Sequence, residues 1–298
     1  MLPQVRHLPS APGVYRFRDI RGRVLYVGRA TELRSRVASY WSVLAGRRHL
    51  RPMVAAVARV EAVVCDSVHE AAWLERNLLE ERLPRWNRTR GGQEVPVYLT
   101  VDPGPAGPGL KVTHRPGPGP TFGPYLGGVR ARQAASALHR LHPLSYAAST
   151  LTGAEREMAE RRGVRPADRA ALAAAVTAIL RREPDAVAAA RAVLIALRDL
   201  ASQSQAFEHA GHLQTELEAL DWITSPQRAT TGDVGDFVAH GWSDGTLVRF
   251  TVRSGRVREW SLRASTERAA APHLAATPPD WTAYAHRNAE LAAVLISG

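Results

Sequence analysis

The chain of 298 residues is 45% hydrophobic and carries a net charge of +11, so it can fill the cores of two or three modules and lacks the composition of a disordered chain. Its single cysteine, Cys65, excludes an internal disulfide, a four-cysteine zinc site and a cysteine-ligated iron–sulfur cluster. No apolar run reaches the length of a membrane span, and the first residues lack the apolar core of a signal peptide. We therefore expect a cytoplasmic protein with no membrane partner.

The positive charge is concentrated at the start of the chain. Residues 1–60 hold twelve arginines and only two acids, a local charge of +10 out of the total of +11. Lys111 is the only lysine, so an arginine-preferring genome would explain the choice of arginine over lysine, but it would not explain the missing acids. The asymmetry favours a polyanion, such as nucleic acid, as the ligand of this first segment.

The first 92 residues are expected to form a small α+β domain. Strand formers and turn residues predict a hairpin, and apolar spacing predicts the helices. Ser67 and Glu70 have the spacing of a capping box at the start of one of these helices. The expected strands are 13–19, 23–28 and 61–65, and the expected helices are 31–41, 49–59 and 68–82.

The rest of the chain is expected to form three further segments. Residues 93–149 are rich in Gly and Pro and read as a β extension, with strands near 97–101 and 110–114 and a helix near 130–141. Residues 150–228 are Ala-rich and helical, and the apolar stripe in 205–223 predicts an antiparallel hairpin over 189–223. Residues 229–298 are expected to form a short β segment, with strands near 234–240, 247–252 and 257–262, and a tail of loop and helix.

Glu75 is the first candidate for chemistry. In the predicted helix it shares a stripe with Ala72 and Leu79. A carboxylate between apolar neighbours loses solvation, which costs free energy unless a cation or donor meets it. Glu75 is therefore a candidate metal ligand or catalytic group, and the alternative is an edge glutamate that pairs with an arginine.

Two tyrosines occupy the predicted hairpin. A two-residue turn at 20–21 would place Tyr15 and Tyr26 directly opposite, whereas a three-residue loop with Gly22 left-handed would shift the register by one residue. The sequence leaves this choice open, and strand tyrosines usually serve packing alone. Arg36 and Tyr40 lie one helical turn apart in the next helix, where an arginine is more often a solvated surface residue.

Several motifs in order give these residues a family resemblance. Pro12-Gly13-Val14-Tyr15 and Val24-Leu25-Tyr26-Val27-Gly28-Arg29-Ala30 resemble the two motifs of the GIY-YIG nuclease superfamily. The likeness continues through three further blocks, and the set is similar to the N-terminal nuclease domain of UvrC, the bacterial excision-repair nuclease family. The further blocks are Leu33–Tyr40, Glu70–Leu78 and Pro84–Asn87.

The resemblance extends into the rest of the chain. Thr121-Phe122-Gly123-Pro124-Tyr125 matches the segment that follows the nuclease domain in UvrC, and the hairpin at 189–223 is similar to the module by which UvrC meets its repair partner UvrB. The ribonuclease-H-like domain and the tandem helix-hairpin-helix motifs of full-length UvrC have no room in this length. The chain therefore resembles the short homologue of UvrC, the Cho type, which the family associates with the 3′-side incision only.

The resemblance implies roles for the motif residues. Glu75 matches the family's metal ligand, and a divalent cation, Mg²⁺ or Mn²⁺, is the implied cofactor. Tyr15 and Tyr26 match the tyrosines that position and deprotonate the attacking water; a phenol, whose pKa is ordinarily about 10, must then be shifted by nearby cations. Arg36 matches the arginine that clamps the scissile phosphate, and the implied products carry 5′-phosphate and 3′-hydroxyl ends.

Supporting positions and DNA contacts follow from the same match. Tyr40 and Asn87 match supporting residues, and Arg29 stands where the family commonly has lysine. An arginine keeps the charge but cannot release its proton, so an electrostatic role survives and a proton-transfer role does not. No nucleotide cofactor is expected, since phosphate-loop and dinucleotide-binding glycine patterns are absent. The expected DNA contacts are Arg29, Arg34, Arg36, Arg47 and Arg48.

The leading hypothesis is therefore a metal-dependent endonuclease of nucleotide excision repair that makes the 3′-side incision near a lesion in damaged duplex DNA, in the cytoplasm at the nucleoid, with UvrB as its protein partner. One alternative is a GIY-YIG endonuclease that acts on branched or foreign DNA outside excision repair. Another is a non-catalytic DNA-binding relic, and the chain could also be a fragment of a longer fusion.

Overall fold

The computed structural model describes residues 2–42, 48–91, 94–230 and 235–297. It divides the chain into two compact units, and each is described here by itself. The first unit combines Met1–Gln93 with Pro226–Gly298, and the second is Glu94–Ser225. The first compact unit joins the first of the four segments predicted from the sequence to the last. The functions assigned to the four segments stay predictions. Among the described helices, none has the length and apolar character needed to cross a bilayer.

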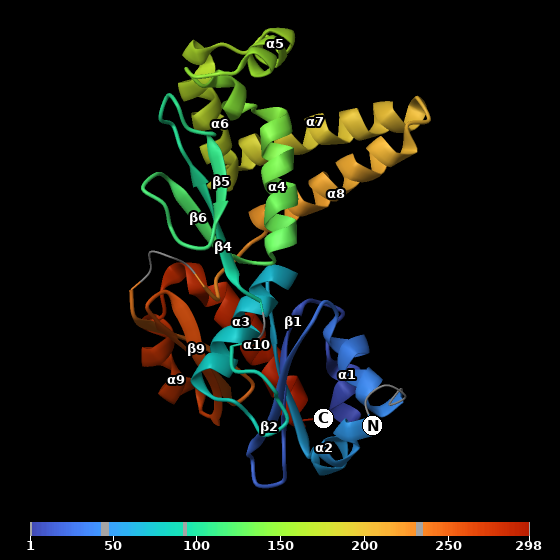
Figure 1. Cartoon of the computed structure of the whole chain (residues 1–298). Coiled ribbons are helices and arrows are strands. Elements are labelled where there is room, and N and C mark those ends of the chain that lie inside the picture. Colours follow the sequence, from blue (N-terminus) through green and yellow to red (C-terminus); the bar gives the residue numbers. More distant parts are fainter. Residues whose placement is uncertain (1, 43–47, 92–93, 231–234, 298) are drawn as a thin grey trace. The chain divides into compact units, whose positions relative to one another are not determined.

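The amino-terminal part of the first unit is the predicted three-stranded antiparallel sheet with flanking helices (Figure 1). The strand order is β2-β1-β3, so β1 is central and β2 is an edge strand. The strands are β1 (Gly13–Arg18), β2 (Val24–Ala30) and β3 (Arg59–Val64). The helices are α1 (Leu33–Ser42), α2 (Arg51–Ala56) and α3 (Val68–Glu81), with 3₁₀ turns η1 (Pro3–His7) and η2 (Arg48–Leu50).

The hairpin register differs from both pairings considered from the sequence. The turn is the three-residue form with Gly22 left-handed (φ 76°), and the Asp19 carboxylate accepts the N–H groups of Arg21 and Arg23. A β-bulge after Phe17 then shifts the register once more, so that Phe17 faces Tyr26. The turn residues alone carry no signal for this bulge, because it depends on how the strand packs.

Glycine is required opposite Tyr15. The register pairs Tyr15 with Gly28, and a Cβ atom at Gly28 would lie 2.5 Å from the Tyr15 phenol oxygen. Because Gly28 has no side chain, the Tyr15 ring can lie across it and reach the next tyrosine. The glycine of the second motif thus has a packing function in the hairpin.

Only one of the two hydrogen bonds of the predicted capping box forms at the start of helix α3. The Ser67 hydroxyl accepts the Glu70 N–H as expected. The Glu70 carboxylate instead accepts the N–H groups of Asp66, Arg228 and Ala229. Glu70 is fully buried, and this burial raises the pKa of its carboxyl to about 7. The side chain that the sequence assigned to local capping therefore joins the start of α3 to the carboxyl-terminal segment.

The carboxyl-terminal segment is built into the first unit. Its strands form an antiparallel sheet in the order β7-β8-β9, and the tail is almost entirely helical. Leu295 packs in the same hydrophobic core as β1, and the Asn288 amide pairs with both the N–H and the C=O of Val64 in β3. The elements are β7 (Phe237–Ser243), β8 (Thr246–Arg253), β9 (Arg256–Ala264), α9 (Glu267–Ala275) and α10 (Pro279–Ser297).

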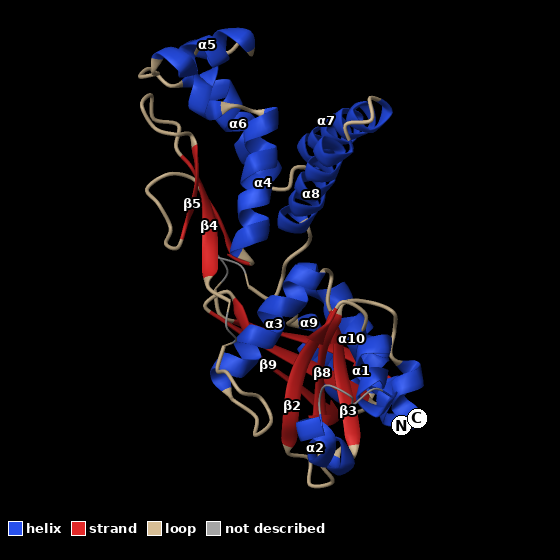
Figure 2. Cartoon of the chain, turned by 45° about the vertical axis from the view of Figure 1, so that its right-hand side comes forward, coloured by secondary structure: helices blue, strands red, loops and turns tan. Residues whose placement is uncertain are grey.

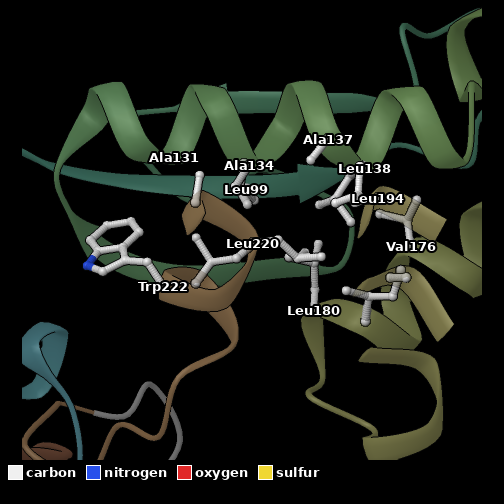
Figure 3. Close-up of a cluster of buried hydrophobic side chains, with 14 of the residues drawn as sticks. Leu99, Ala131, Ala134, Ala137, Leu138, Val176, Leu180, Leu194, Leu220 and Trp222 are labelled. Carbon is white, nitrogen blue, oxygen red and sulfur yellow. The ribbon is translucent and has the colours of Figure 1, made fainter. Parts of the chain in front are cut away.

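The second unit has its own core, which the Gly/Pro-rich segment and the helical region share. Sheet residues such as Leu99 pack with Leu138 of α4 and Leu220 of α8 (Figure 3). The strands are β4 (Pro96–Val101), β5 (Leu110–Thr113) and β6 (Thr121–Leu126), in the order β5-β4-β6. The helices are α4 (Gly128–Leu141), α5 (Gly153–Arg161), α6 (Arg169–Leu180), α7 (Pro184–Gln203) and α8 (Phe207–Thr224).

Helices α7 and α8 form the predicted antiparallel hairpin (Figure 2). Gln205 in the connection adopts a left-handed conformation (φ 58°), which allows a tight turn. Apolar side chains near the turn face solvent: Phe207 is 68% exposed and Leu200 is 62% exposed. Large exposed apolar groups gathered at one place are typical of a protein-binding surface.

Candidate active site

Three tyrosines from three elements of the first unit converge. Tyr15 of β1, Tyr26 of β2 and Tyr40 of α1 have ring centroids 6.0 to 6.3 Å apart. The phenol oxygens of Tyr15 and Tyr40 lie 2.8 Å apart, in hydrogen-bond distance. Phe17 packs edge-on against Tyr40 at 5.1 Å between centroids and supports the group from the core. The bulged register brings Tyr26 diagonally across from Tyr15, so that both rings lie on one face of the sheet.

Arg36 joins the tyrosines from α1, one helical turn before Tyr40. Its guanidinium carbon lies 5.6 Å from the centre of the Tyr40 ring, and its side chain interacts with the Tyr15 phenol. Burial alone would lower the pKa of the guanidinium, but the surrounding phenols of Tyr15 and Tyr40 outweigh burial and raise that pKa. Arg36 is therefore a fixed positive charge at the tyrosine cluster and not a solvated surface residue.

Glu75 reaches the same place from α3. One carboxylate oxygen accepts the backbone N–H of Arg29 at 3.2 Å, and the other lies 3.4 Å from the Arg29 side-chain Nε. The Glu75 charge also acts on Tyr26. Burial is the largest cause that raises the pKa of the Tyr26 phenol, Tyr40 is the next, and the Glu75 charge raises it further. The carboxylate therefore pairs with an arginine and also lies near Tyr26. Its role as a metal ligand or catalytic group stays a prediction.

The protein environment keeps the phenols neutral. Burial raises the pKa of Tyr15 well above its ordinary value, and the neighbouring tyrosines raise it further. Burial likewise raises the pKa of Tyr26. Arg36 lowers both pKa values, but by less than burial raises them. The protein's own cations therefore do not lower either phenol pKa below its ordinary value.

Asn87 acts on the edge strand that carries Tyr26. Its side-chain amide accepts the Val27 N–H at 3.0 Å and donates to the Val27 C=O at 2.8 Å. The neighbouring Trp86 N–H donates to Leu25 C=O. These bonds take the place of a further strand along β2, so that Asn87 holds Tyr26 through the backbone.

The expected DNA-contacting arginines have different surroundings. Arg29 contacts Glu75, and the Arg34 Nε donates to the C=O of Leu8 at 2.6 Å, so that both are tethered. Arg47 lies outside the described residues, and of Arg48 only the backbone, in η2, is described. The contact between Tyr40 and Tyr15 could not be predicted from residue spacing, because the position of α1 relative to β1 depends on tertiary packing.

Comparison with known proteins agrees with the motifs. A family model described as the UvrC-like GIY-YIG domain matches residues 11–88. Residues 11–88 are therefore a UvrC-like GIY-YIG domain. The matched range contains all three tyrosines, Arg36 and Glu75, and the resemblance expected from the sequence is confirmed at this level.

The similar curated proteins are much longer than this chain. The UvrABC system protein C of Geobacter metallireducens is 38% identical over 142 residues, which are 47% of this chain and 23% of that protein. That of Mycobacterium leprae is 41% identical over 145 residues, again 47% of this chain and 22% of that protein. The chain thus spans about a quarter of the length of the curated relatives it matches.

Solved structures with similarity to the chain include the nuclease domain of one bacterial UvrC. The GIY-YIG N-terminal endonuclease domain of UvrC from Thermotoga maritima, bound to magnesium, is 29% identical and covers 30% of this chain and 100% of that chain, with a TM-score of 0.26. A point mutant of the same domain, bound to its catalytic divalent cation, is 27% identical with the same coverage and a TM-score of 0.27.

Proposed function

We propose that this chain is a metal-dependent DNA endonuclease of nucleotide excision repair that hydrolyses a phosphodiester with water. The observation that carries the proposal is the convergence of three tyrosines, Arg36 and Glu75 within a UvrC-like GIY-YIG domain. The relatives named UvrABC system protein C support the repair pathway. Such an enzyme acts where the chromosome is, so we place it in the cytoplasm, at the nucleoid.

The site fits a divalent cation held by one protein ligand. Glu75 is a carboxylate with a partly exposed side chain (22%), which suits a hard cation such as Mg²⁺ or Mn²⁺. Among the described residues, no group of three or more His, Cys, Asp and Glu could form a metal cage. The remaining ligands would be water and DNA phosphate oxygens, as expected for magnesium at a phosphodiester. When bound, the cation supplies charge stabilisation at the departing 3′-oxygen and a field that favours phenolate.

The side chains of this site divide the remaining work. Arg36 holds the non-bridging oxygens of the scissile phosphate and stabilises the charge that develops there. Tyr26 is partly exposed whereas Tyr15 is fully buried, so we assign the contact with the attacking water to the Tyr26 phenol oxygen. Tyr15 and Tyr40 fix the direction of that phenol through packing and the bond between their own oxygens. The products are a 5′-phosphate and a 3′-hydroxyl.

A nicking assay on the full chain tests the proposal. The wild type should cut one strand of a lesion-bearing duplex on the 3′ side with Mg²⁺ or Mn²⁺ and not with chelator. Glu75→Gln should lower the rate by at least about a hundredfold while DNA affinity stays within about twofold, because the carboxylate serves the chemistry and the arginines serve affinity. Glu290→Gln, the same change at an exposed site of α10, is the matched control.

The result also separates the alternative functions. Undiminished cutting by Glu75→Gln would refute the role of Glu75. Faster cutting of branched or undamaged DNA than of lesion-bearing duplex would assign the chain to another pathway, and DNA binding without any cutting would make it a non-catalytic binder.

The helical hairpin is the proposed contact for UvrB. Its exposed Phe207 and Leu200 form an apolar tip that a helical partner could cover. Phe207→Ser should weaken binding of purified UvrB by at least about tenfold, measured by calorimetry, since aromatic anchors dominate such interfaces. Glu208→Ser at the neighbouring exposed position is the control. Equal affinity of the two variants would place the contact elsewhere.

A further inference from the structure

The first unit contains a pocket on the opposite face of the nuclease sheet. Its volume is about 350 Å³, and it is lined by β1 and β2, the end of α3, and β8 and β9. Neighbouring strand residues point to opposite faces, so Arg16 and Val27 face this pocket while Tyr15 and Tyr26 face the active site. The pocket exists only because the carboxyl-terminal segment packs against the nuclease sheet.

Positive charge exceeds negative charge around the pocket. Five arginines and two glutamates line it. Behind it, the single carboxylate of Glu61 pairs with three guanidinium groups, and that of Glu80 pairs with three others. The partners of Glu61 are Arg16, Arg18 and Arg59, and those of Glu80 are Arg76, Arg256 and Arg258.

Two of the five lining arginines pair with no acid among the described residues. Arg82 follows α3, and Arg253 ends β8. Both are exposed, and within the part of the chain that the structure describes neither forms an ion pair. Flat guanidinium groups in excess over carboxylates match a phosphate, which accepts paired hydrogen bonds from them.

Three lining residues hold buried polar atoms that lack a partner. The Arg16 Nη2, the Trp260 Nε1 and the Thr251 Oγ1 make no hydrogen bond within the described chain. These residues are 6%, 1% and 7% exposed. Arg16 lies over Trp260, with its guanidinium carbon 3.9 Å from the ring centre. All three groups can donate a hydrogen bond, and all three residues line the pocket, so a ligand rich in acceptors suits this lining.

The walls of the pocket suit a flat ring. Val24, Val27, Leu78 and Pro84 line it on the side of the nuclease domain. An apolar wall beside donors and guanidinium groups is the usual composition of a nucleotide site, in which the wall covers the base or sugar and the cations hold the phosphate. We propose that this pocket binds one nucleotide, with its phosphate, of the DNA strand on which the nuclease acts.

The residues around the pocket favour a nucleotide that is part of a DNA strand over a free mononucleotide. Residues 82–90 run from the pocket, where Arg82 and Pro84 line it, to Asn87, which is bonded to β2 beside Tyr26. This stretch also carries Arg85, Arg88 and Arg90, so the segment between the pocket and Asn87 is basic. The assignment to DNA rests on the proposed nuclease function, whereas the assignment to a nucleotide phosphate rests on the pocket alone.

The test measures binding of a fluorescein-labelled single-stranded oligonucleotide to the full chain in the presence of chelator. The double variant Arg82→Ala/Arg253→Ala should bind about tenfold more weakly, and the slope of log affinity against log salt between about 50 and 200 mM should fall by about 0.7, the share of one phosphate contact in a single strand. Arg268→Ala removes the same charge from an exposed position of α9 and should stay within about twofold of the wild type.

A second variant keeps the charge unchanged. Thr251→Val removes a buried hydroxyl that has no partner, so it should raise the thermal midpoint of the protein and yet weaken oligonucleotide binding severalfold. Binding equal to the wild type by Thr251→Val, or a loss in the double variant no larger than that of Arg268→Ala, would overturn the proposal.

Competition identifies the source of the nucleotide. Millimolar dAMP or inorganic phosphate should displace the oligonucleotide from the wild type only weakly, because the strand also makes contacts outside the pocket. Displacement by dAMP at micromolar concentrations, lost in the double variant, would reassign the pocket to a mononucleotide. Since no cleavage is needed in this assay, failure of the nicking assay and failure of the pocket proposal are distinguishable.

Discussion

At the scale of single residues, the candidate active site combines buried phenols with one guanidinium and one carboxylate. The pKa values of Tyr15 and Tyr26 are raised by burial first and by neighbouring tyrosines second. Arg36 opposes this shift only in part, so that the protein alone holds an array of neutral phenols beside a cation and a carboxylate. In the proposed mechanism, a phenol of this cluster would act as a base only with the added positive charge of a bound divalent cation.

Arg36 gives the sharpest test at this scale. Arg36→Ala should lower kcat by about tenfold to a hundredfold and change DNA affinity far less, because the guanidinium is held among the phenols and not in solvent. Arg34→Ala removes the same charge from the solvent side of α1 and should affect affinity more than kcat. Single-turnover nicking and fluorescence anisotropy measure the two quantities. A loss of affinity alone in Arg36→Ala would reassign this residue to tracking of the DNA backbone.

At the scale of elements, the β1–β2 hairpin sets the geometry of the site. A three-residue turn and a bulge after Phe17 place Tyr15 against Gly28 and Tyr26 against Phe17. One of the two pairings left open by the sequence would set Tyr15 directly opposite Tyr26. In that pairing the Tyr15 ring could not lie over Gly28. The edge strand is then fixed from outside by Asn87.

Gly28→Ala tests this packing. The added Cβ would lie within 2.8 Å of both tyrosine rings, so Tyr15 must move, and we expect a loss of about 1–3 kcal/mol in unfolding free energy together with a clear loss of cleavage. Gly211→Ala is the matched control, since a Cβ there meets nothing within 4 Å and the residue lies in a helix. Chemical denaturation and nicking measure the two effects. Full activity in Gly28→Ala would show that the Tyr15 position is not critical.

At the scale of the whole molecule, the last seventy residues complete the nuclease unit. The α10 side chains Leu295 and Asn288 join its core and its sheet. The Glu70 carboxylate connects α3 to residues 228 and 229. The two ends of the chain therefore fold as one compact unit, while the segment between them folds around a separate core.

The stability of this unit should depend on pH through Glu70. Its pKa is raised from 4.5 to about 7 by burial, so the folded state retains a proton that the unfolded state has lost. The contribution of Glu70 to stability should therefore be full below about pH 4.5 and be lost as the pH rises through about 7, by on the order of 3 kcal/mol. Denaturant unfolding of wild type and Glu70→Gln across this range measures the difference, with Glu290→Gln as the control. Parallel profiles of wild type and Glu70→Gln would contradict the assignment.

The sequence by itself determined the local elements and the chemistry available. Periodicity located α1, α3 and the α7–α8 hairpin to within a few residues, because apolar spacing and end signals act over short distances. The motifs identified the nuclease domain, and the charge of residues 1–60 pointed to a polyanion. The roles of the individual site residues stay predictions for the experiments above.

The tertiary structure decided what depends on contacts between distant residues. The bulge in the hairpin, the pairing of Glu75 with Arg29, and the bonds from Glu70 to Arg228 and Ala229 have no local signal, because each is set by the burial of partners that lie far apart in the sequence. The raised phenol pKa values exist only after β1, β2 and α1 have packed together and excluded water. The arginine-lined pocket exists only after the carboxyl-terminal sheet has packed against the nuclease domain. Burial, and with it the cost of a charge, is a property of the assembled fold.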